Sequence, residues 1–281
     1  MTTDDQEEFN SRRRRLFDRD PIRYRDGRPG YPPEVFALLR RRCGLGPGCR
    51  VLEIGPGTGQ ATRPLLATGA DVVAIELGPD LAATLAGSLV DDASSDRLSI
   101  HVGAFEEVPL DGDLRPESFD LIVSATAFHW IPQPDGFERC HRLLKPSGHL
   151  ALWWNFFGDP DRPDPFHEAI QPLLAAKAPD LLRGDSSAGG AHPYALDVSA
   201  RVADFDRSGR FGPVEHTRIG WTGRHTAAEI RTMFGSFSPW LATDPSVREP
   251  LLDDLEALAT ERFNGVVERP YNTAIYHARR R

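Results

Sequence analysis

The chain has 281 residues, of which 40% are hydrophobic, 26% charged and 9% aromatic. This composition supports a real core and excludes a largely disordered chain, a collagen and a coiled coil. The formal net charge of −8 gives no general attraction to nucleic-acid phosphates. We expect no membrane span, because no run of about 18 apolar residues occurs.

Cysteine usage and the first residues bear on the compartment. The sequence opens with MTTDDQEEF, which lacks the apolar core of a secretion signal. Cys43, Cys49 and Cys140 make an odd count, which does not predict a disulfide framework. Their spacing matches no common zinc site, and no pair of histidines has a metal-ligand pattern. We therefore expect a cytoplasmic protein without a metal site.

Residues 1–30 are expected to form an N-terminal arm. They include a basic run at 12–15, inside a segment that changes from acidic to basic. Such charge blocks are usually solvated tails. The alternative is an arm that lies across a ligand pocket and closes it. Pro32 and Pro33 then predict the start of a helix, and Gly44 predicts its end.

Between residues 50 and 155 the hydrophobic pattern changes its period repeatedly. Apolar runs that predict strands alternate with helical periodicity at 61–66 and 81–89. The predicted strands cover 51–54, 71–75, 98–102, 121–124 and 150–154. Strands that alternate with helices form a parallel sheet covered on both faces. Residues 31–155 are therefore expected to be a Rossmann-like binding domain.

The remaining chain interrupts this rhythm and then resumes it. Residues 156–212 are rich in Pro, Asp, Ser and Gly, and we expect them to form a cap. Residues 213–281 are expected to complete the sheet. The predicted elements of these two segments are helices at 166–176, 227–234 and 251–263, and strands at 214–221 and 271–277. The predicted fold class is α/β: a doubly wound, mostly parallel seven-stranded Rossmann-like sheet with an N-terminal arm and an inserted cap after strand five.

The most informative segment is a glycine loop after the first predicted strand. Gly55, Gly57 and Gly59 follow an apolar run and precede a helix. Glycine permits positive φ and lets a ligand approach the backbone, and the helix N-terminus beyond offers free N–H groups. Glu76 ends the second predicted strand about 20 residues later, where an acid can accept both ribose hydroxyls of a nucleoside.

Two cofactor classes fit this layout. The dinucleotide fingerprint Gly-x-Gly-x-x-Gly needs a glycine where the chain has Gln60. The carboxylate of Glu53, just before the loop, suits a ligand that carries an ammonium group and would repel a pyrophosphate. Both observations favour S-adenosylmethionine over NAD.

Residues 53–59 and Glu76 resemble the signature of class I S-adenosylmethionine-dependent methyltransferases. Four later segments are similar to strands and turns of that family, in the same order: residues 103–109, 119–124, 128–130 and 143–150. The resemblance implies S-adenosylmethionine as the cofactor and the following residues as its contacts: Glu53, Gly55, Gly57, Gly59, Glu76, Leu77, Ala104, Phe105, Ala125, Tyr24 and Arg28. The family often has an acidic residue where this chain has Ala104. Backbone groups there, with Phe105 stacked on the base, are expected to bind the adenine instead.

The methyl acceptor is expected at the ends of the fourth and fifth predicted strands. His129 is the one base we nominate: it can accept a proton from a substrate hydroxyl or hold a substrate carboxylate. The alternative is a loop histidine that merely packs beside its neighbour. The expected substrate-binding residues are Trp130, Trp154, Tyr31 and His192. Strand alternation places Trp153 and Trp154 on opposite faces of the sheet, so at most one of them faces the ligand.

Within the class, Tyr24, residues 28–32, His129 with Trp130, and Trp154 look most like the trans-aconitate-type and natural-product methyltransferases. The predicted function is S-adenosylmethionine-dependent methyl transfer to an O, N or C nucleophile of a small molecule. The expected acceptor classes are a carboxylate-bearing molecule or a natural-product intermediate. Two alternatives stay open: a non-catalytic S-adenosylmethionine-binding regulator, and a nucleic-acid methyltransferase, against which the acidic charge counts.

Overall fold

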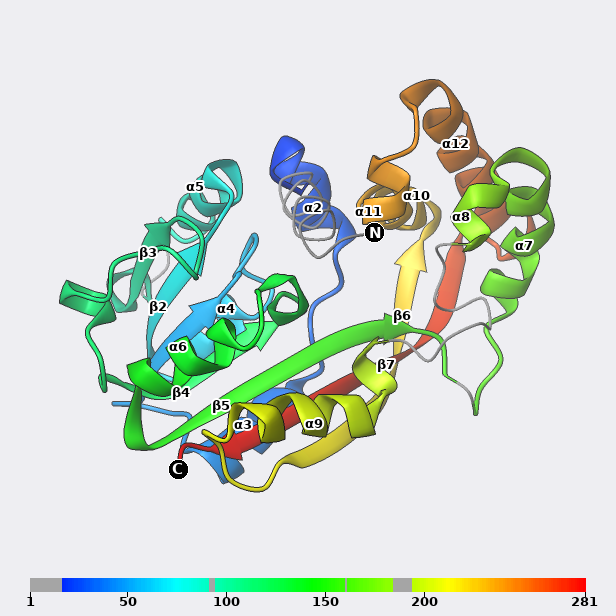
Figure 1. Ribbon diagram of the computed structural model, residues 1–281. Helices are drawn as coiled ribbons and strands as arrows, with labels where there is room; N and C mark the ends of the chain where they lie inside the picture. Colours follow the sequence, from blue (N-terminus) through cyan, green and yellow to red (C-terminus); the bar gives the residue numbers. More distant parts are fainter. Residues whose placement is uncertain (1–16, 91–93, 160, 184–193) are drawn as a thin grey trace.

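The computed structural model describes residues 17–90, 94–159, 161–183 and 194–281. Within them, seven strands form one sheet in the order β3-β2-β1-β4-β5-β7-β6 (Figure 1). The strands are β1 Arg50–Ile54, β2 Asp71–Glu76, β3 Leu98–Val102, β4 Phe119–Ala125, β5 Leu144–Phe157, β6 Glu215–Thr226 and β7 Val266–Arg279. The first five strands pair in parallel, and β7 runs antiparallel to both β5 and β6. The predicted doubly wound, mostly parallel sheet is confirmed.

The helices flank the sheet in the order of a doubly wound fold. Their bounds are α2 Pro21–Gly27, α3 Pro33–Cys43, α4 Thr62–Ala67, α5 Pro79–Gly87, α6 Asp135–Leu143, α7 Pro165–Lys177, α8 Pro179–Arg183, α9 Val198–Ser208, α10 Ala227–Gly235, α11 Ser238–Leu241 and α12 Pro245–Arg262. The helix predicted from Pro33 to Gly44 is present, and Gly44 ends it with φ of 71°. The sequence interpretation had no helix at α2, α6 or α9.

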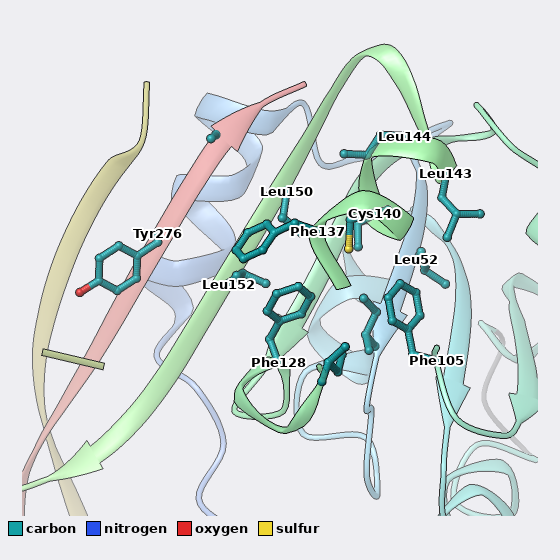
Figure 2. Packing of buried hydrophobic residues seen from close by; sticks show 14 of the residues in the cluster. Leu52, Phe105, Phe128, Phe137, Cys140, Leu143, Leu144, Leu150, Leu152 and Tyr276 are labelled. Atoms are coloured by element: carbon teal, nitrogen blue, oxygen red, sulfur yellow. The ribbon is translucent and has the colours of Figure 1, made fainter. Parts of the chain in front are cut away.

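Two apolar cores cover the two faces of the sheet. On one face, Phe137 and Cys140 of α6 pack over Leu52 and Leu150 of the strands (Figure 2). The core of the other face is formed with α3, α4 and α5. Trp154 belongs to the first core and Trp153 to the second, which confirms the predicted alternation of these two side chains.

The described helices of residues 156–212, a segment that we expect to form a cap, lie in two places. Helices α7 and α8 pack with α10 and α12 in a third core. This core lies beyond one end of β5, β6 and β7 (Figure 1). A buried ion pair between Arg269 of β7 and Asp164, at 2.7 Å, fixes the start of α7 there. Helix α9 instead packs beside α6 on the sheet, through Phe205.

The described part of the N-terminal arm is packed against the rest of the molecule. Helix α2 lies between α5 and α10 (Figure 1). Asp18, in the short 3-10 helix η1 Phe17–Arg19, accepts backbone hydrogen bonds from Asp80 and Leu81, both at 2.9 Å, and so caps α5 from outside. Arg23 pairs with Glu249 of α12 at 3.3 Å. The basic run at 12–15 lies outside the described residues.

Candidate cofactor and acceptor site

The carboxyl ends of β1, β2 and β4 meet at one edge of the sheet and form the floor of a cavity of about 200 Å³. Ligands in open α/β sheets bind at this edge, where the strand order reverses. The cavity is lined by the glycine loop, by the end of β2, by the turn after β3 and by the segment after β4. The arm supplies Phe17, Tyr24 and Arg28 on the opposite side. The cavity therefore lies between the sheet edge and the arm.

Gly55 and Gly57 adopt conformations that other residues rarely reach, with φ of 69° and 57°. A Cβ added at Gly55 would lie 2.6 Å from Cβ of Ala127, and one added at Gly57 would lie 2.9 Å from Cε1 of Tyr24. Both glycines line the cavity. The loop thus presents backbone without side chains at the cavity surface, and a bulky ligand can contact this backbone directly.

Glu76 ties the glycine loop to the end of β2. One of its carboxylate oxygens accepts the backbone N–H of Gly57 and the other accepts that of Gly78, each at 2.9 Å. Burial raises the pKa of this carboxyl, while the two backbone donors act in the opposite direction. Each oxygen has a further lone pair. Glu76 lines the cavity, so those lone pairs are the natural acceptors for ligand hydroxyls.

Glu53 is fully buried beneath the loop, and one of its oxygens is unsatisfied. Oε2 accepts the hydroxyl of Thr62 at 2.7 Å, whereas Oε1 has no partner in the described part of the chain. Burial raises the pKa of Glu53 to about 8. A buried acceptor without a partner is costly, and an ammonium group is the ligand feature that would satisfy it.

Arg28 brings a cation to the cavity inside a ring of aromatic side chains. Its guanidinium carbon lies 5.4, 5.2 and 5.1 Å from the ring centroids of Phe17, Tyr24 and Phe237. Nη2 donates to the backbone oxygen of Ser236 at 3.0 Å, and Nε is buried with no partner among the residues described. A carboxylate is the group that would complete this site. Burial raises the pKa of Tyr24, which keeps that phenol neutral beside Arg28.

His129 follows β4 in the 3-10 helix η4 Phe128–Trp130 and lines the cavity. The indole N–H of Trp154 donates to Nδ1 of His129 at 3.0 Å. The imidazole packs against Trp130, with ring centroids 4.6 Å apart, and against Tyr194 of the 3-10 helix η5 Tyr194–Leu196, at 5.7 Å. The hydrogen bond from Trp154 to Nδ1 favours a role in which His129 holds an oxygen of the substrate over a role in which it takes a proton from the substrate.

Residues 52–152 match the family model described as a methyltransferase domain. This part of the chain is similar to methyltransferase domains. An uncharacterized methyltransferase of Mycobacterium tuberculosis is 35% identical over 132 residues, which are 47% of this chain and 49% of the relative. The chain thus spans about half the length of the first curated relatives that it matches. An uncharacterized methyltransferase-like protein of Schizosaccharomyces pombe is 24% identical over 246 residues, 87% of this chain and 86% of that protein.

Solved structures agree with the observed fold. A candidate type II methyltransferase from Anaeromyxobacter dehalogenans superimposes with a TM-score of 0.61 at 19% identity, covering 90% of this chain and 97% of the other. Phosphoethanolamine N-methyltransferase 2 of Haemonchus contortus, in complex with phosphomonomethylethanolamine and S-adenosylhomocysteine, gives a TM-score of 0.50 at 16% identity, covering 88% of this chain and 52% of that one. At such identities the likeness shows the fold alone.

The matched region 52–152 and the arm bring most of the predicted site residues together. The cavity contains Gly55, Gly57, Glu76, Leu77, Phe105, His129, Trp130, Tyr24 and Arg28. A smaller cavity beside it contains Ala125 and Tyr31, whose hydroxyl pairs with the hydroxyl of Thr126 at 3.0 Å.

Four of the predicted residues that the structure describes are not among the residues that line these cavities. Glu53 lies beneath the loop, and Gly59 packs against Leu85, whose Cδ1 would lie 2.6 Å from a Cβ added at the glycine. Ala104 lies between two lining residues, and Trp154 is next to the cavity only through His129. His192 lies outside the described residues.

Sequence reasoning missed several residues in and around this site, among them Phe17, Thr126 and Tyr194. Phe17 lines the cavity and meets Tyr24 edge-on at 5.6 Å, but nothing in the sequence around it indicates this place. Thr126 directly follows β4 and has φ of 60°, so the rule that strand ends meet at one edge would have found it. Tyr194 reaches His129 from η5, a long-range contact that no local pattern signals.

No helix in the described ranges is long and apolar enough to cross a membrane. Across the same ranges, no three His, Cys, Asp or Glu side chains gather where they could hold a metal ion.

Proposed function

We propose that this chain is an S-adenosylmethionine-dependent methyltransferase that acts on a small molecule and holds its cofactor in the cavity above the glycine loop. The observation that carries the proposal is the pairing of Glu76 with Gly57 at the cavity floor. It places a buried carboxylate beside bare loop backbone, where the ribose of an adenosyl group would be held. Leu77 and Phe105 would enclose the adenine.

The two ends of the amino acid part of the cofactor have matching partners. The unsatisfied oxygen of Glu53 would accept the α-ammonium group, and the unpartnered Nε of Arg28 would donate to the α-carboxylate. A nicotinamide dinucleotide offers a pyrophosphate in place of the ammonium group, and a pyrophosphate has no proton to donate to the unsatisfied oxygen of Glu53. The donor set therefore fits S-adenosylmethionine better than a redox nucleotide.

When bound, the cofactor supplies a methyl group on a positively charged sulfur. The residues of this chain would orient the acceptor in line with that group and exclude water, and such positioning is worth several orders of magnitude in rate. The arm performs the exclusion by covering the cavity with Phe17 and Tyr24. His129 and Trp130 flank the side from which an acceptor would approach.

The acceptor is proposed to be a small molecule of the trans-aconitate or natural-product type. The aromatic surroundings of His129 support a small organic acceptor, since Trp130 and Tyr194 both pack on that ring. Among the relatives, a ubiquinone biosynthesis O-methyltransferase of Xanthomonas campestris is 34% identical over 107 residues, 38% of this chain and 43% of that protein. The net charge of −8 does not favour a nucleic-acid acceptor.

The location in a reducing, cytoplasmic compartment also stays a proposal. Its support is that Cys43, Cys49 and Cys140 are all buried and free. Burial raises the pKa of Cys49 to about 11, so this thiol is a poor nucleophile at neutral pH.

Transfer of labelled methyl groups tests the proposal. The purified chain is incubated with methyl-labelled S-adenosylmethionine and pools of small carboxylic acids, phenols and amines, with Gly57→Val as the inactive control. We expect label in at least one pool and none with the control. Tight binding of the cofactor without transfer to any pool would contradict the proposal and favour the non-catalytic regulator.

A further inference from the structure

We propose that Trp154 is a positioning residue that holds His129 in the tautomer with its proton on Nε2, so that the imidazole acts toward the methyl acceptor as a hydrogen-bond donor and not as a base. The inference rests on the proposed function, because it assigns a role at that same site. It concerns one hydrogen bond between β5 and η4, which the methyl-transfer chemistry by itself does not require.

The direction of this hydrogen bond fixes the tautomer. Nε1 of Trp154 lies 3.0 Å from Nδ1 of His129. An indole N–H is a donor only, so Nδ1 of His129 must offer its lone pair. A neutral imidazole carries a single proton, which therefore lies on Nε2. If the ring took up a second proton, that proton would occupy Nδ1 and break the bond with Trp154.

The surroundings keep both rings in this arrangement. Trp154 is 5% exposed, lies near the carboxyl end of β5, and meets Tyr194 and Tyr276 edge-on at 5.4 and 6.3 Å. His129 lies between Trp130 and Tyr194, at 4.6 and 5.7 Å. A flip of the imidazole would have to displace these rings. Trp154 is thus a rigid donor from the sheet, and His129 is the part that meets the cavity.

The rings that pack on His129 carry a cation that is paired with a carboxylate. The guanidinium of Arg201 lies over the ring of Tyr194, 3.3 Å from its centroid, on the aromatic cluster that packs against His129. The phenol of Tyr194 has its pKa raised by burial to about 12 and stays neutral. Asp204 faces Arg201 at 2.9 Å and is paired with it. The cluster therefore offers His129 neutral rings and a paired cation.

A donor at this position selects the chemistry of the acceptor. An N–H holds an oxygen that is already ionised, such as a carboxylate oxygen, and takes no proton from it. That oxygen forms the new bond to the methyl carbon while the bond from carbon to sulfur breaks and its electron pair stays on sulfur. No proton moves in this balance. An aliphatic hydroxyl, which must lose a proton, would find no base in His129.

Nitrogen-15 NMR of the histidine rings tests the inference on the whole chain. The signals of His129 are identified by their loss in His129→Gln. We expect the neutral pattern with a protonated Nε2 and a hydrogen-bonded, unprotonated Nδ1 in the unaltered protein. In Trp154→Phe, which removes the indole N–H and keeps an aromatic ring, we expect a mixture of both tautomers.

Trp153→Phe is the matched control. This neighbour is fully buried on the opposite face of the sheet, and its indole nitrogen has no hydrogen-bond partner among the described residues. Trp153→Phe should leave the His129 signals unchanged. A proton on Nδ1 in the unaltered protein, or equal spectra for Trp154→Phe and the unaltered protein, would overturn the inference.

Kinetics separate this inference from the proposed function. With an acceptor found in the methyl-transfer experiment, Trp154→Phe should lower kcat about 10-fold or more and change the pH profile of kcat, while the Kd for S-adenosylhomocysteine stays within about 2-fold. Methyl transfer with an unchanged pH profile in Trp154→Phe overturns the inference alone. Failure of all methyl transfer overturns the proposed function, and with it the role of His129 toward an acceptor.

Discussion

The side chain of Glu76 accepts a hydrogen bond from the backbone N–H of Gly57 at 2.9 Å. The same carboxylate also accepts from Gly78 at 2.9 Å, so one acid at the end of β2 fixes the loop after β1 and the turn before α5. The site is therefore built from the ends of two adjacent parallel strands. A change at this position acts on the shape of the loop as well as on the contact with a ligand.

Glu76→Ala is expected to weaken binding of S-adenosylhomocysteine by about 1–3 kcal/mol, because the ribose hydroxyls lose a charged acceptor and the loop loses its tie. Isothermal titration calorimetry measures the change. Asp71→Ala is the control, since this carboxylate is exposed at the other end of the same strand. An unchanged dissociation constant in Glu76→Ala would remove Glu76 from the site.

Gly57→Val should abolish cofactor binding and leave a folded protein. At φ of 57° a branched side chain is strained, and its Cβ would lie 2.9 Å from Tyr24 in the arm. Circular dichroism and calorimetry together measure fold and binding. Gly87→Ala is the control, because a Cβ there meets nothing within 4 Å. Retention of binding by the valine variant would show that the ligand does not contact this loop.

Asp18→Ala should release bound S-adenosylhomocysteine faster, by about 2- to 30-fold, because the variant loses a helix cap that ties the arm to α5. Stopped-flow dissociation measures this rate. The control is Asp26→Ala, an exposed carboxylate of the same arm that pairs with Arg25. Equal rates in both variants would mean that the arm does not limit ligand release.

Glu53 should make the protein less stable as the pH rises. Its pKa is raised from 4.5 to about 8 in the folded state, so the folded chain holds this proton more tightly than the unfolded chain. The stabilising contribution is complete below the unfolded value of 4.5 and is lost as the pH rises through about 8. The free energy of unfolding, from urea titrations at about pH 5 and about pH 8, should change less in Glu53→Gln than in the unaltered protein.

The control for this measurement is Glu107→Gln, which replaces an exposed glutamate. It should keep the pH dependence of the unaltered protein. If Glu53→Gln keeps that dependence too, the carboxyl of Glu53 is already ionised in the folded protein at neutral pH.

Much of the sheet could be predicted because each strand has a local pattern. The apolar runs at 51–54 and 71–75 are found within β1 and β2, which extend them by one residue at one end. The glycine loop was recognisable for the same reason, since its residues are adjacent in the sequence. Parallel pairing of β1 with β2 is then enough to place Glu76 beside the loop.

Helices α6 and α9 were missed for a different reason. In α6, Phe137, Cys140 and Leu143 recur at helical spacing, but the segment is short and follows several prolines and polar residues. In α9, the start is marked only by Asp197, whose side chain accepts from the backbone N–H of Ala200. Both helices gain their stability by covering the sheet, which a short local pattern does not reveal.

Some contacts of the site that join distant segments could not be predicted from local patterns. Phe17 and Asp18 reach the cavity edge and α5 through tertiary contacts of the arm. The bond between Trp154 and His129 joins residues whose side chains meet only after β4 and β5 have paired. The sequence indicated that these two residues belong to the site. The folded geometry was needed to show that Trp154 donates a hydrogen bond to His129.

We expect the cavity above the glycine loop to take an adenosyl sulfur cofactor and not a redox nucleotide. The most direct measurement is isothermal titration calorimetry of the unaltered chain with S-adenosylhomocysteine and, separately, with NAD. We expect saturable binding of S-adenosylhomocysteine with one site per chain and no measurable heat with NAD. Binding of NAD without binding of S-adenosylhomocysteine would contradict it.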